Sequence, residues 1–582
     1  MNKGTNISEE NIAWTRGYSD DYWNDNVSPL FFELLGDQLT QIVNVELNGI
    51  MGYSKPGNKT DNLLLLHKGH AYFNLEVLKR KVEYEIPPML RNNDILNYFQ
   101  EGKGKYGKET MKKQPFRLTK RILAEIRIML YDGNGSITKT ASAYEEWSKK
   151  KFEPFYEQFD QKMLYASRRE GVDDYLKLAS ELDRLMIGHF RLVRYGIPVH
   201  NIGMNLIAQY LLTRFLGKEK ATASYPILLS GLKHKTSETN QALFQLASTI
   251  KSSPQLRSAI LSIPSDKIFS RLRNDRSSDA ERLTSELESF FKEFGIRGFT
   301  REPYYPRWND APEHVFNILK SMVQEEEPKN KKRDAKGHNQ LAMTEKEIAE
   351  NVKATTLGWA KWKIFSLVLE FARKYIIFRE NQRFNLDNWI TMNRKIFLSI
   401  GRIFYEQKIL NDPSDIFFLR KNEIHRIARH SASSTEVERI KQAAKERKKE
   451  FLLNENLTPP KFLIGTQESD VPSQSLEAML HGIPASQGVH SGLVRVLDRI
   501  EDIWQVRTGE ILVVPRTDPG WTPVFRMIGG LITETGGLLS HGAVVSREYG
   551  IPAVTNIPNA CRIFKTGQTV TIDGSKGTVT TI

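Results

Sequence analysis

Two patterns of hydrophobic and polar positions divide this chain. Over most of its length, from about residue 115, apolar residues recur at three- and four-residue spacing, which predicts amphipathic helices. Clear examples are 181–194, 205–216 and 281–294, the last followed by Gly295 as a stop signal. From about residue 477 the pattern changes to short β-branched runs, which predict strands: 492–496, 510–514 and 569–573.

These patterns predict a multidomain protein, in which a large mainly α-helical domain with a few short strands precedes a small α/β domain. We expect the helical, substrate-binding domain to span residues 1–455, with a flexible charged loop at about 324–340. Residues 456–476 contain three prolines and are expected to form a linker or hinge. The small domain then covers residues 477–582.

Composition narrows the class of protein. The net charge of +14 could indicate a nucleic-acid partner, but the lysines are scattered among many glutamates, so we expect no nucleic-acid binding. No apolar run reaches the roughly 18 residues that a membrane span needs, and the N-terminus has no apolar signal-peptide core. The single cysteine, Cys561, suits a reducing compartment. We therefore expect a cytoplasmic protein without a membrane partner.

The most informative stretch begins with an apolar, β-branched segment at 530–533, which predicts a buried strand. Gly536 and Gly537 follow and allow a sharp turn, and Ser540 is a good N-cap for a helix that starts at His541. The free N–H groups of a first helical turn attract anions, and a neutral imidazole nitrogen can attack phosphorus. On spacing alone, a phosphate-carrying histidine competes with an ordinary capping histidine.

A family resemblance favours the phosphate-carrying histidine. The run from Gly536 to Arg547, with His541 inside it, resembles the phosphohistidine signature of the PEP-utilising enzyme mobile, or swivelling, domain. That domain occurs in pyruvate phosphate dikinase, phosphoenolpyruvate synthase, rifampicin phosphotransferase and phenylphosphate synthase. Residues 518–523, Asp-Pro-Gly-Trp-Thr-Pro, resemble a motif of the rifampicin phosphotransferase branch, and 482–492 resemble the domain's opening turn and strand. The resemblance covers about the last hundred residues.

A second motif lies on a predicted helix within the helical domain. Arg379 and Arg383 are four residues apart and share one helix face, with Glu380 next to it. They match an Arg-Glu-x-x-Lys/Arg element that in this family faces the phosphoryl-transfer site. The resemblance implies that the two arginines stabilise the transferring group and that Glu380 takes a proton from the attacking hydroxyl. The alternative is ion pairing on a helix surface.

Weaker resemblances suggest residues that contact the substrate. A Val-Ser-Pro-Leu element that includes Pro29 follows an aromatic stretch that includes Trp23, and both could line a substrate site or form an aromatic core. Another family-like segment combines arginines, a glutamate and a tryptophan, which could grip phosphate and stack on an aromatic alcohol. Its candidates are Arg297, Arg301, Glu302, Arg307 and Trp308. A structural arginine network around the tryptophan explains the segment equally well.

Together these features predict a phosphotransferase subunit in which His541 relays a phosphoryl group to a hydroxyl of an organic alcohol or phenol, with Gly536, Gly537, Ser540 and Gly542 shaping its phosphate site. The chain starts where the family's substrate domain would start, so the resemblance implies that a separate ATP-grasp protein supplies ATP and Mg²⁺, as in phenylphosphate synthase. No metal ligands of the chain's own are expected. The alternatives are a component of a rifamycin-type antibiotic phosphotransferase and a non-catalytic phosphocarrier or scaffold.

Overall fold

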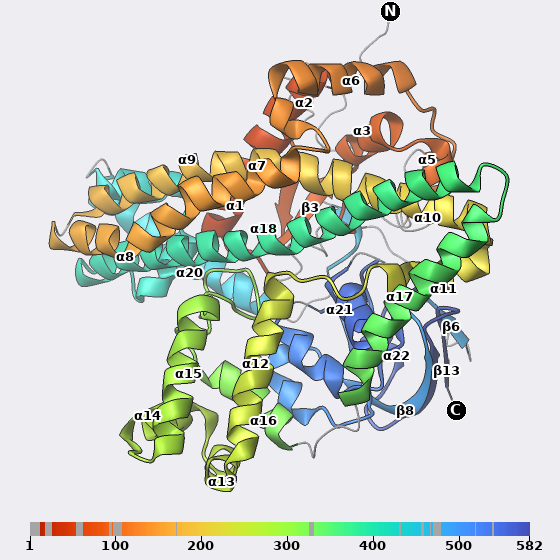
Figure 1. The fold of residues 1–582 in the computed structure, drawn as a ribbon. Helices are drawn as coiled ribbons and strands as arrows, with labels where there is room; N and C mark the ends of the chain where they lie inside the picture. Colours follow the sequence, from red (N-terminus) through yellow and green to blue (C-terminus); the bar gives the residue numbers. More distant parts are fainter. Residues whose placement is uncertain are drawn as a thin grey trace, which may run out of the picture. The chain divides into compact units, whose positions relative to one another are not determined.

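Contacts within the chain divide it into two compact units, each assembled from separate stretches of sequence. Unit 1 comprises Met1–Gly203, Thr300–Tyr305 and Asn385–Pro472, and unit 2 comprises Met204–Phe299, Pro306–Phe384 and Ser473–Ile582. The computed structural model (Figure 1) describes residues 12–17, 26–53, 62–91, 96, 107–169, 171–324, 331–429, 432–455, 459–465, 467–468, 479–517, 519–537 and 540–581. Trp23, a candidate substrate contact, lies outside the described residues.

Unit 1 contains an antiparallel sheet with the strand order β2-β3-β1-β4-β5 among its described residues. The strands are β1 (Ala13–Thr15), β2 (Leu64–His67), β3 (His70–Asn74), β4 (Phe462–Ile464) and β5 (Gln467–Glu468). Trp14 of β1 lies opposite Leu463 of β4, and both side chains are buried. The stretch expected to be a linker, 456–476, therefore supplies two strands that complete a sheet begun at the N-terminal end of the described chain.

The helices of unit 1 come between the strands of this sheet along the chain. They are α1 (Pro29–Gln38), η3 (Leu39–Glu46), α2 (Leu47–Met51), α3 (Leu75–Glu85), η5 (Pro88–Leu90), α5 (Lys108–Lys112), α6 (Leu118–Tyr131), η8 (Gly133–Gly135), α7 (Thr140–Trp147), η9 (Ser148–Phe152), α8 (Glu153–Arg168), α9 (Val172–Tyr195), η10 (Gly196–Asn201), η11 (Pro413–Phe418), α19 (Lys421–Ala428) and α20 (Ser434–Asn454). Segments η3, η9 and η10 are π-helical and continue neighbouring α-helices.

Two helices pass from one unit into the other. Helix α10 (Ile202–Leu216) starts at the end of one stretch of unit 1, and α18 (Gly358–Glu406) is a single 49-residue helix, the long green ribbon of Figure 1. The part of α18 up to Phe384, which carries Arg379, Glu380 and Arg383, belongs to unit 2.

Unit 2 also contains α11 (Lys218–Leu228), α12 (Lys235–Ser252), α13 (Pro254–Ser262), α14 (Ser265–Asn274), α15 (Ser278–Phe294), α16 (Glu313–Gln324) and α17 (Lys331–Lys353). Helix α17 corrects one expectation, because residues 331–340 of the predicted charged loop are helical. Six of these ten residues are Lys, Arg, Ala or Gln, which have high intrinsic helix propensity even where no apolar stripe marks a helix.

A mixed sheet follows in unit 2, with the order β6-β13-β12-β8-β9-β10-β11-β7 among the described residues. Its strands are β6 (Met479–His481), β7 (Ile483–Ser486), β8 (Val489–Val496), β9 (Ile511–Val514), β10 (Gly530–Thr533), β11 (Ala553–Thr555), β12 (Thr569–Asp573) and β13 (Thr578–Thr581). Strands β8 to β11 run parallel, with Leu531 opposite Leu512 on one side and Ala553 on the other. Short helical segments η12 (Ile500–Gln505), η13 (Pro519–Arg526), α21 (His541–Tyr549) and α22 (Ala560–Ile563) connect the strands.

One hydrophobic cluster joins the sheet to the preceding helices within unit 2. It includes Phe290 of α15 and Phe316 of α16 together with Leu512 of β9, Leu531 of β10 and Val545 of α21. The predicted fold class, a helical part followed by a small α/β part, is confirmed. The shared core adds that α12 to α16 and the α/β part pack as one unit. Among the described residues, no helix is long and apolar enough to cross a membrane.

Candidate functional site

The segment around His541 folds as its sequence predicts. Strand β10 is buried along its whole length, and α21 begins at His541 with Ser540 as its N-cap. The Ser540 hydroxyl accepts a hydrogen bond from the backbone N–H of Ala543 at 3.4 Å. The helix ends at Gly550, whose φ of 63° gives the left-handed cap that glycine favours. His541 therefore occupies the first turn, where the helix dipole favours an anion.

Two neighbouring glycines in the turn before α21 have different constraints. Gly536 has a φ of +111°, and a Cβ atom added to it would lie 2.9 Å from the Ser540 side chain. At Gly537 an added Cβ would meet no atom within 4 Å. Gly542, in the first turn of α21, faces the Thr517 hydroxyl, which an added Cβ would approach to 2.5 Å. Of these three glycines, only Gly536 combines a positive φ with a close neighbour.

We therefore expect Gly536→Ala to lower the free energy of unfolding by about 1–3 kcal/mol, because it forces an L-residue into a glycine conformation next to the N-cap. Gly537→Ala is the matched control and should change it by less than about 0.5 kcal/mol. Urea denaturation of the two variants measures the difference. Equal effects of the two substitutions would show that the backbone of this turn is not constrained as described.

His541 lies within a cluster of charged side chains from two other segments of unit 2. Its side chain is buried, with 4% of its surface exposed. Glu380, Arg383 and Arg379, from α18, and Arg297, from the loop after α15, all act on it electrostatically. Each of the four is at least nine-tenths buried. Residues about 160 and 240 positions away in the sequence thus gather around the histidine.

The surroundings of His541 keep its imidazole neutral. Burial lowers the pKa of His541 to about 3, with the arginines adding to the effect and Glu380 opposing it. At neutral pH the ring therefore has a lone pair on one nitrogen, as a nucleophile requires. The three arginines place positive charge where a phosphoryl group on that nitrogen would carry negative charge.

Glu380 is held as a carboxylate by the same cluster. Burial works to raise the pKa of Glu380, but Arg383 and Arg379, with a contribution from His234, outweigh it, and the pKa lies well below its usual range. The Oε1 atom lies 3.7 Å from Nη1 of Arg383 and 4.0 Å from Nε of Arg379. The Oε2 atom accepts a hydrogen bond from the Thr236 hydroxyl at 3.1 Å. The carboxylate is thus fixed between two cations and a hydroxyl.

The lowered pKa of His541 has a consequence for stability. Between about pH 6.5 and pH 3 the unfolded chain holds a proton on this ring and the folded chain does not, so the histidine makes unfolding easier as the pH falls. Between pH 7 and pH 5.5, we expect the free energy of unfolding to fall by about 1 kcal/mol less in His541→Gln than in the parent protein.

The measurement is urea unfolding of both proteins at the two pH values. His481→Gln, at an exposed position of β6, is the control and should keep the pH dependence of the parent. If His541→Gln has the same pH dependence of the free energy of unfolding as the parent, the His541 ring is solvated and titrates normally in the folded protein.

Sequence reasoning missed the first turn of α12 as part of this site. Thr236 bonds Glu380 directly, and Asn381 accepts a hydrogen bond from the backbone N–H of Lys235 at 3.0 Å. His234 caps α12, since its Nδ1 accepts from the backbone N–H of Ser237. About 145 residues separate these groups from α18 in sequence, and a lone threonine next to a capping histidine is no signal without the fold.

The predicted substrate segment at 297–308 is divided between the units. In unit 2, Arg297 lies 5.4 Å from the ring centroid of Phe384 and joins the His541 cluster. Trp308 is fully buried, stacks on Phe290 at 6.0 Å and donates its backbone N–H to the Arg297 carbonyl. Arg307 is also buried, at 2% exposure. The position of Trp308 favours the structural interpretation of that residue.

The remaining candidates lie in unit 1. Glu302 is buried and accepts hydrogen bonds from the Ser28 hydroxyl at 2.7 Å and the Ser28 backbone N–H at 2.9 Å. Ser28 is the N-cap of α1, and Pro29 is its first residue. Arg301 lies 3.9 Å from an oxygen of Asp387. The structure thus gives Glu302 a role in fixing the start of α1, and substrate contacts by these residues remain predictions.

Comparison with known proteins gives two matches to family models. Residues 195–380 match the rifampicin phosphotransferase fourth domain, and residues 506–577 match the PEP-utilising enzyme mobile domain. The first match ends at Glu380 and the second contains His541. The resemblance to this family that was inferred from the motifs is therefore confirmed, although Arg383 of the charged cluster lies just beyond the first match.

Individual relatives agree with these matches. Over 375 residues, 62% of this chain and 41% of the relative, the chain is 27% identical to a rifampicin phosphotransferase of Bacillus cereus. Over 354 residues, 59% of this chain and 38% of the relative, it is 27% identical to a prodigiosin synthesizing transferase of Serratia marcescens. Over 114 residues, 19% of this chain and 14% of the relative, it is 41% identical to a phosphoenolpyruvate synthase of Aeropyrum pernix. The chain spans about two fifths of the length of the rifampicin phosphotransferases that it matches.

Proposed function

We propose that this chain, which combines a PEP-utilising mobile domain with a helical segment like that of the rifampicin phosphotransferases, is a phosphotransferase that works through a phosphohistidine at His541. The phosphoryl group passes from an ATP-derived donor to His541 and then to a hydroxyl of an organic molecule. The observation that carries the proposal is the buried, neutral imidazole at a helix N-terminus, surrounded by three arginines and one carboxylate.

Two displacements at phosphorus make up the reaction. In the first, an imidazole nitrogen forms a bond to phosphorus while the bond from phosphorus to the donor oxygen breaks. In the second, the acceptor hydroxyl attacks, the nitrogen–phosphorus bond breaks, and the neutral imidazole is restored. Arg379, Arg383 and Arg297 stabilise the charge on the transferring oxygens, which is the main contribution a protein makes in phosphoryl transfer.

The second step releases a proton from the acceptor hydroxyl, and Glu380 is the candidate base. In the unmodified protein Glu380 is a weak base, because Arg383 and Arg379 hold its pKa below the usual range. A phosphoryl group on His541 would draw the same arginines to its own oxygens, which weakens their hold on Glu380 and raises its pKa. Glu380 would thus gain basicity only when the histidine is loaded.

Loading requires His541 to be reached by its donor. With 4% of its surface exposed, the ring is not accessible to a large donor site in the arrangement described, which supports assigning this arrangement to the transfer stage. Relay through a mobile domain needs a second arrangement in which the ring is exposed. We propose that an ATP-grasp protein, which binds the ATP and Mg²⁺, loads the ring there, as in phenylphosphate synthase.

The acceptor is proposed to be an alcohol or phenol rather than a nucleic acid. A rifamycin-type antibiotic is the second candidate acceptor, and the match of residues 195–380 to the rifampicin phosphotransferase fourth domain favours it. A non-catalytic phosphocarrier would have no need to bury Arg379, Glu380 and Arg383 around the histidine, and their burial argues for transfer within this chain.

The experiment combines the protein with an ATP-grasp donor, Mg²⁺ and radiolabelled ATP. Label that is acid-labile and base-stable on the chain, and that moves to phenol or to rifampicin when either is added, supports the proposal and identifies the acceptor class. Label that appears on the chain but moves to no hydroxyl compound favours the phosphocarrier alternative.

A further inference from the structure

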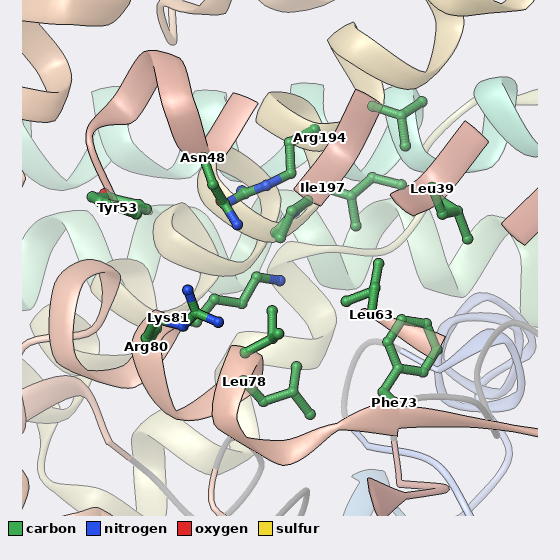
Figure 2. A pocket seen from close by; sticks show the side chains of 13 residues that line it. Leu39, Asn48, Tyr53, Leu63, Phe73, Leu78, Arg80, Lys81, Arg194 and Ile197 are labelled. Atoms are coloured by element: carbon green, nitrogen blue, oxygen red, sulfur yellow. The ribbon is translucent and has the colours of Figure 1, made fainter. Parts of the chain in front are cut away.

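A small cavity in unit 1 is lined mainly by residues of α3, η3, α9 and η10 (Figure 2). Its volume is about 100 Å³, less than the roughly 150 Å³ of a cavity that holds one benzene ring. Arg194, which lines it, donates Nη2 to Oε1 of Glu85 at 2.8 Å. We assign this cavity no ligand. The buried polar contact that the phosphoryl relay leaves unexplained lies in unit 2, in the first turn of α12.

The hydroxyl of Thr236, the second residue of α12, bonds a side chain of another helix. Threonines further along a helix often bond the carbonyl four residues earlier, as Thr213, Thr222 and Thr239 do at 2.8–2.9 Å. Thr236 comes too early in α12 to have a helical carbonyl four residues before it. Its hydroxyl instead bonds Oε2 of Glu380, on α18, at 3.1 Å, and only 1% of the residue is exposed.

The first turn of α12 is attached to α18 at two adjacent residues of that helix. Oδ1 of Asn381 accepts the backbone N–H of Lys235 at 3.0 Å, and the threonine that follows bonds Glu380. A capping box between His234 and Ser237 closes the turn from within α12. These hydrogen bonds fix the position of the threonine hydroxyl relative to α18.

The two oxygens of the Glu380 carboxylate have different surroundings. Although burial opposes it, Arg383 and Arg379 hold the pKa of Glu380 below its usual range, so the carboxylate is ionised and Thr236 donates the bond to Oε2. Among the described residues, no donor lies within hydrogen-bond distance of Oε1. That oxygen lies 3.7 Å from Nη1 of Arg383 and 4.0 Å from Nε of Arg379. Oε1 therefore faces the two arginines that are proposed to stabilise the transferring group.

We propose that Thr236 is a positioning residue for the transfer step, which holds Oε2 of Glu380 so that Oε1 takes the proton of the acceptor hydroxyl. This inference rests on the proposed function. In the transfer step the acceptor oxygen forms its bond to phosphorus, the bond from phosphorus to His541 breaks, and the acceptor proton moves to Oε1 and then to solvent. Without the threonine hydrogen bond the carboxylate can rotate and pair both oxygens with the arginines, which leaves it poorly placed to act as a base.

The test is single-turnover transfer from the labelled chain to phenol or rifampicin, whichever accepts the label, in Thr236→Val. Valine has the shape of threonine without its hydroxyl. We expect the maximal transfer rate to fall about 10- to 100-fold, the effect of losing one hydrogen bond to a charged group. The rate of loading and the acceptor concentration that gives half the maximal rate should stay within about twofold. Thr236→Ser keeps the hydroxyl and should restore the maximal rate to within about threefold of the parent.

Thr239→Val is the matched control, because Thr239 is a buried threonine of the same helix whose hydroxyl bonds the Lys235 carbonyl. It should transfer at the rate of the parent. If Thr236→Val transfers as fast as the parent, if it slows loading and transfer to the same degree, or if Thr236→Ser restores nothing, the hydrogen bond only joins α12 to α18. Each of these results overturns the inference and leaves the relay standing. No label on the parent chain, or label that moves to neither acceptor, would overturn the relay and this inference with it.

Discussion

Replacing His541 by alanine should abolish transfer of label from ATP to the chain, a loss of at least about 10³-fold against the parent protein. The reason is chemical, because alanine offers no nucleophile, and His234, the other histidine near Glu380, uses its Nδ1 to cap α12. The measurement is label retained on the chain after a fixed time with the ATP-grasp donor and Mg²⁺, quantified under basic conditions that preserve phosphohistidine.

His481→Ala is the control for this experiment. His481 is an exposed histidine of the same α/β part, on β6, so its removal tests whether any accessible imidazole becomes labelled. We expect His481→Ala to take up as much label as the parent. If the label persists in His541→Ala, or disappears in His481→Ala, the phosphoryl group is carried elsewhere and the site described around α21 has another purpose.

The second large effect is expected at Glu380. Glu380→Gln should slow transfer from loaded His541 to the acceptor by about 10²–10⁴-fold, the range for losing a general base, while the rate of loading stays within about twofold. The separation follows from the proposed stages, because Glu380 acts electrostatically on His541 in the arrangement described, whereas the proposed loading requires the ring to be exposed. Single-turnover rates for each half-reaction, measured separately, provide the test.

A purely structural role of Glu380 predicts a different outcome. Removing the carboxylate from between Arg379 and Arg383 leaves buried cations uncompensated and should cost about 3–5 kcal/mol in stability. If that were its whole contribution, Glu380→Gln would slow loading and transfer to the same degree, and Glu380→Asp would restore both.

The local structure around His541 could be predicted from the sequence because interactions between neighbouring residues determine it. A β-branched run predicted β10 with the bounds that the structure has, and Ser540 marked the start of α21. Capping chemistry and left-handed glycines depend on a few adjacent residues, so one sequence is enough to read them. The same holds for the Arg379–Arg383 pair, whose spacing places both side chains on one helix face.

Contacts between residues far apart in the sequence could not be predicted in this way. The partners of Glu380 on α12 lie about 145 residues away, and nothing in the spacing of Thr236 indicates that its hydroxyl meets a carboxylate. The pairing of β1 with β4 joins residues about 450 apart, so β4 looked like part of a proline-containing linker. The domain boundaries at 455 and 477 remain a prediction, and the units cut the sequence differently because long helices pass between them.

Of the substrate contacts predicted by family resemblance, some lie near His541 and others have structural positions, and there is a physical reason for the difference. Arginines recur both where anions bind and where they tie loops together, and sequence does not separate the two uses. Arg297 joins the histidine cluster, whereas the neighbouring Trp308 fills the core against Phe290. Glu302 caps the start of α1 through Ser28.

The most direct test of the relay isolates the loaded protein and follows its phosphate. The chain is labelled, freed of donor and ATP, and then mixed with the acceptor alcohol, and the label on His541 and on the acceptor is measured over time. The account predicts that each phosphate lost from His541 appears on the acceptor hydroxyl, with no added nucleotide. Loss of label only as inorganic phosphate, at the same rate with and without acceptor, would contradict it.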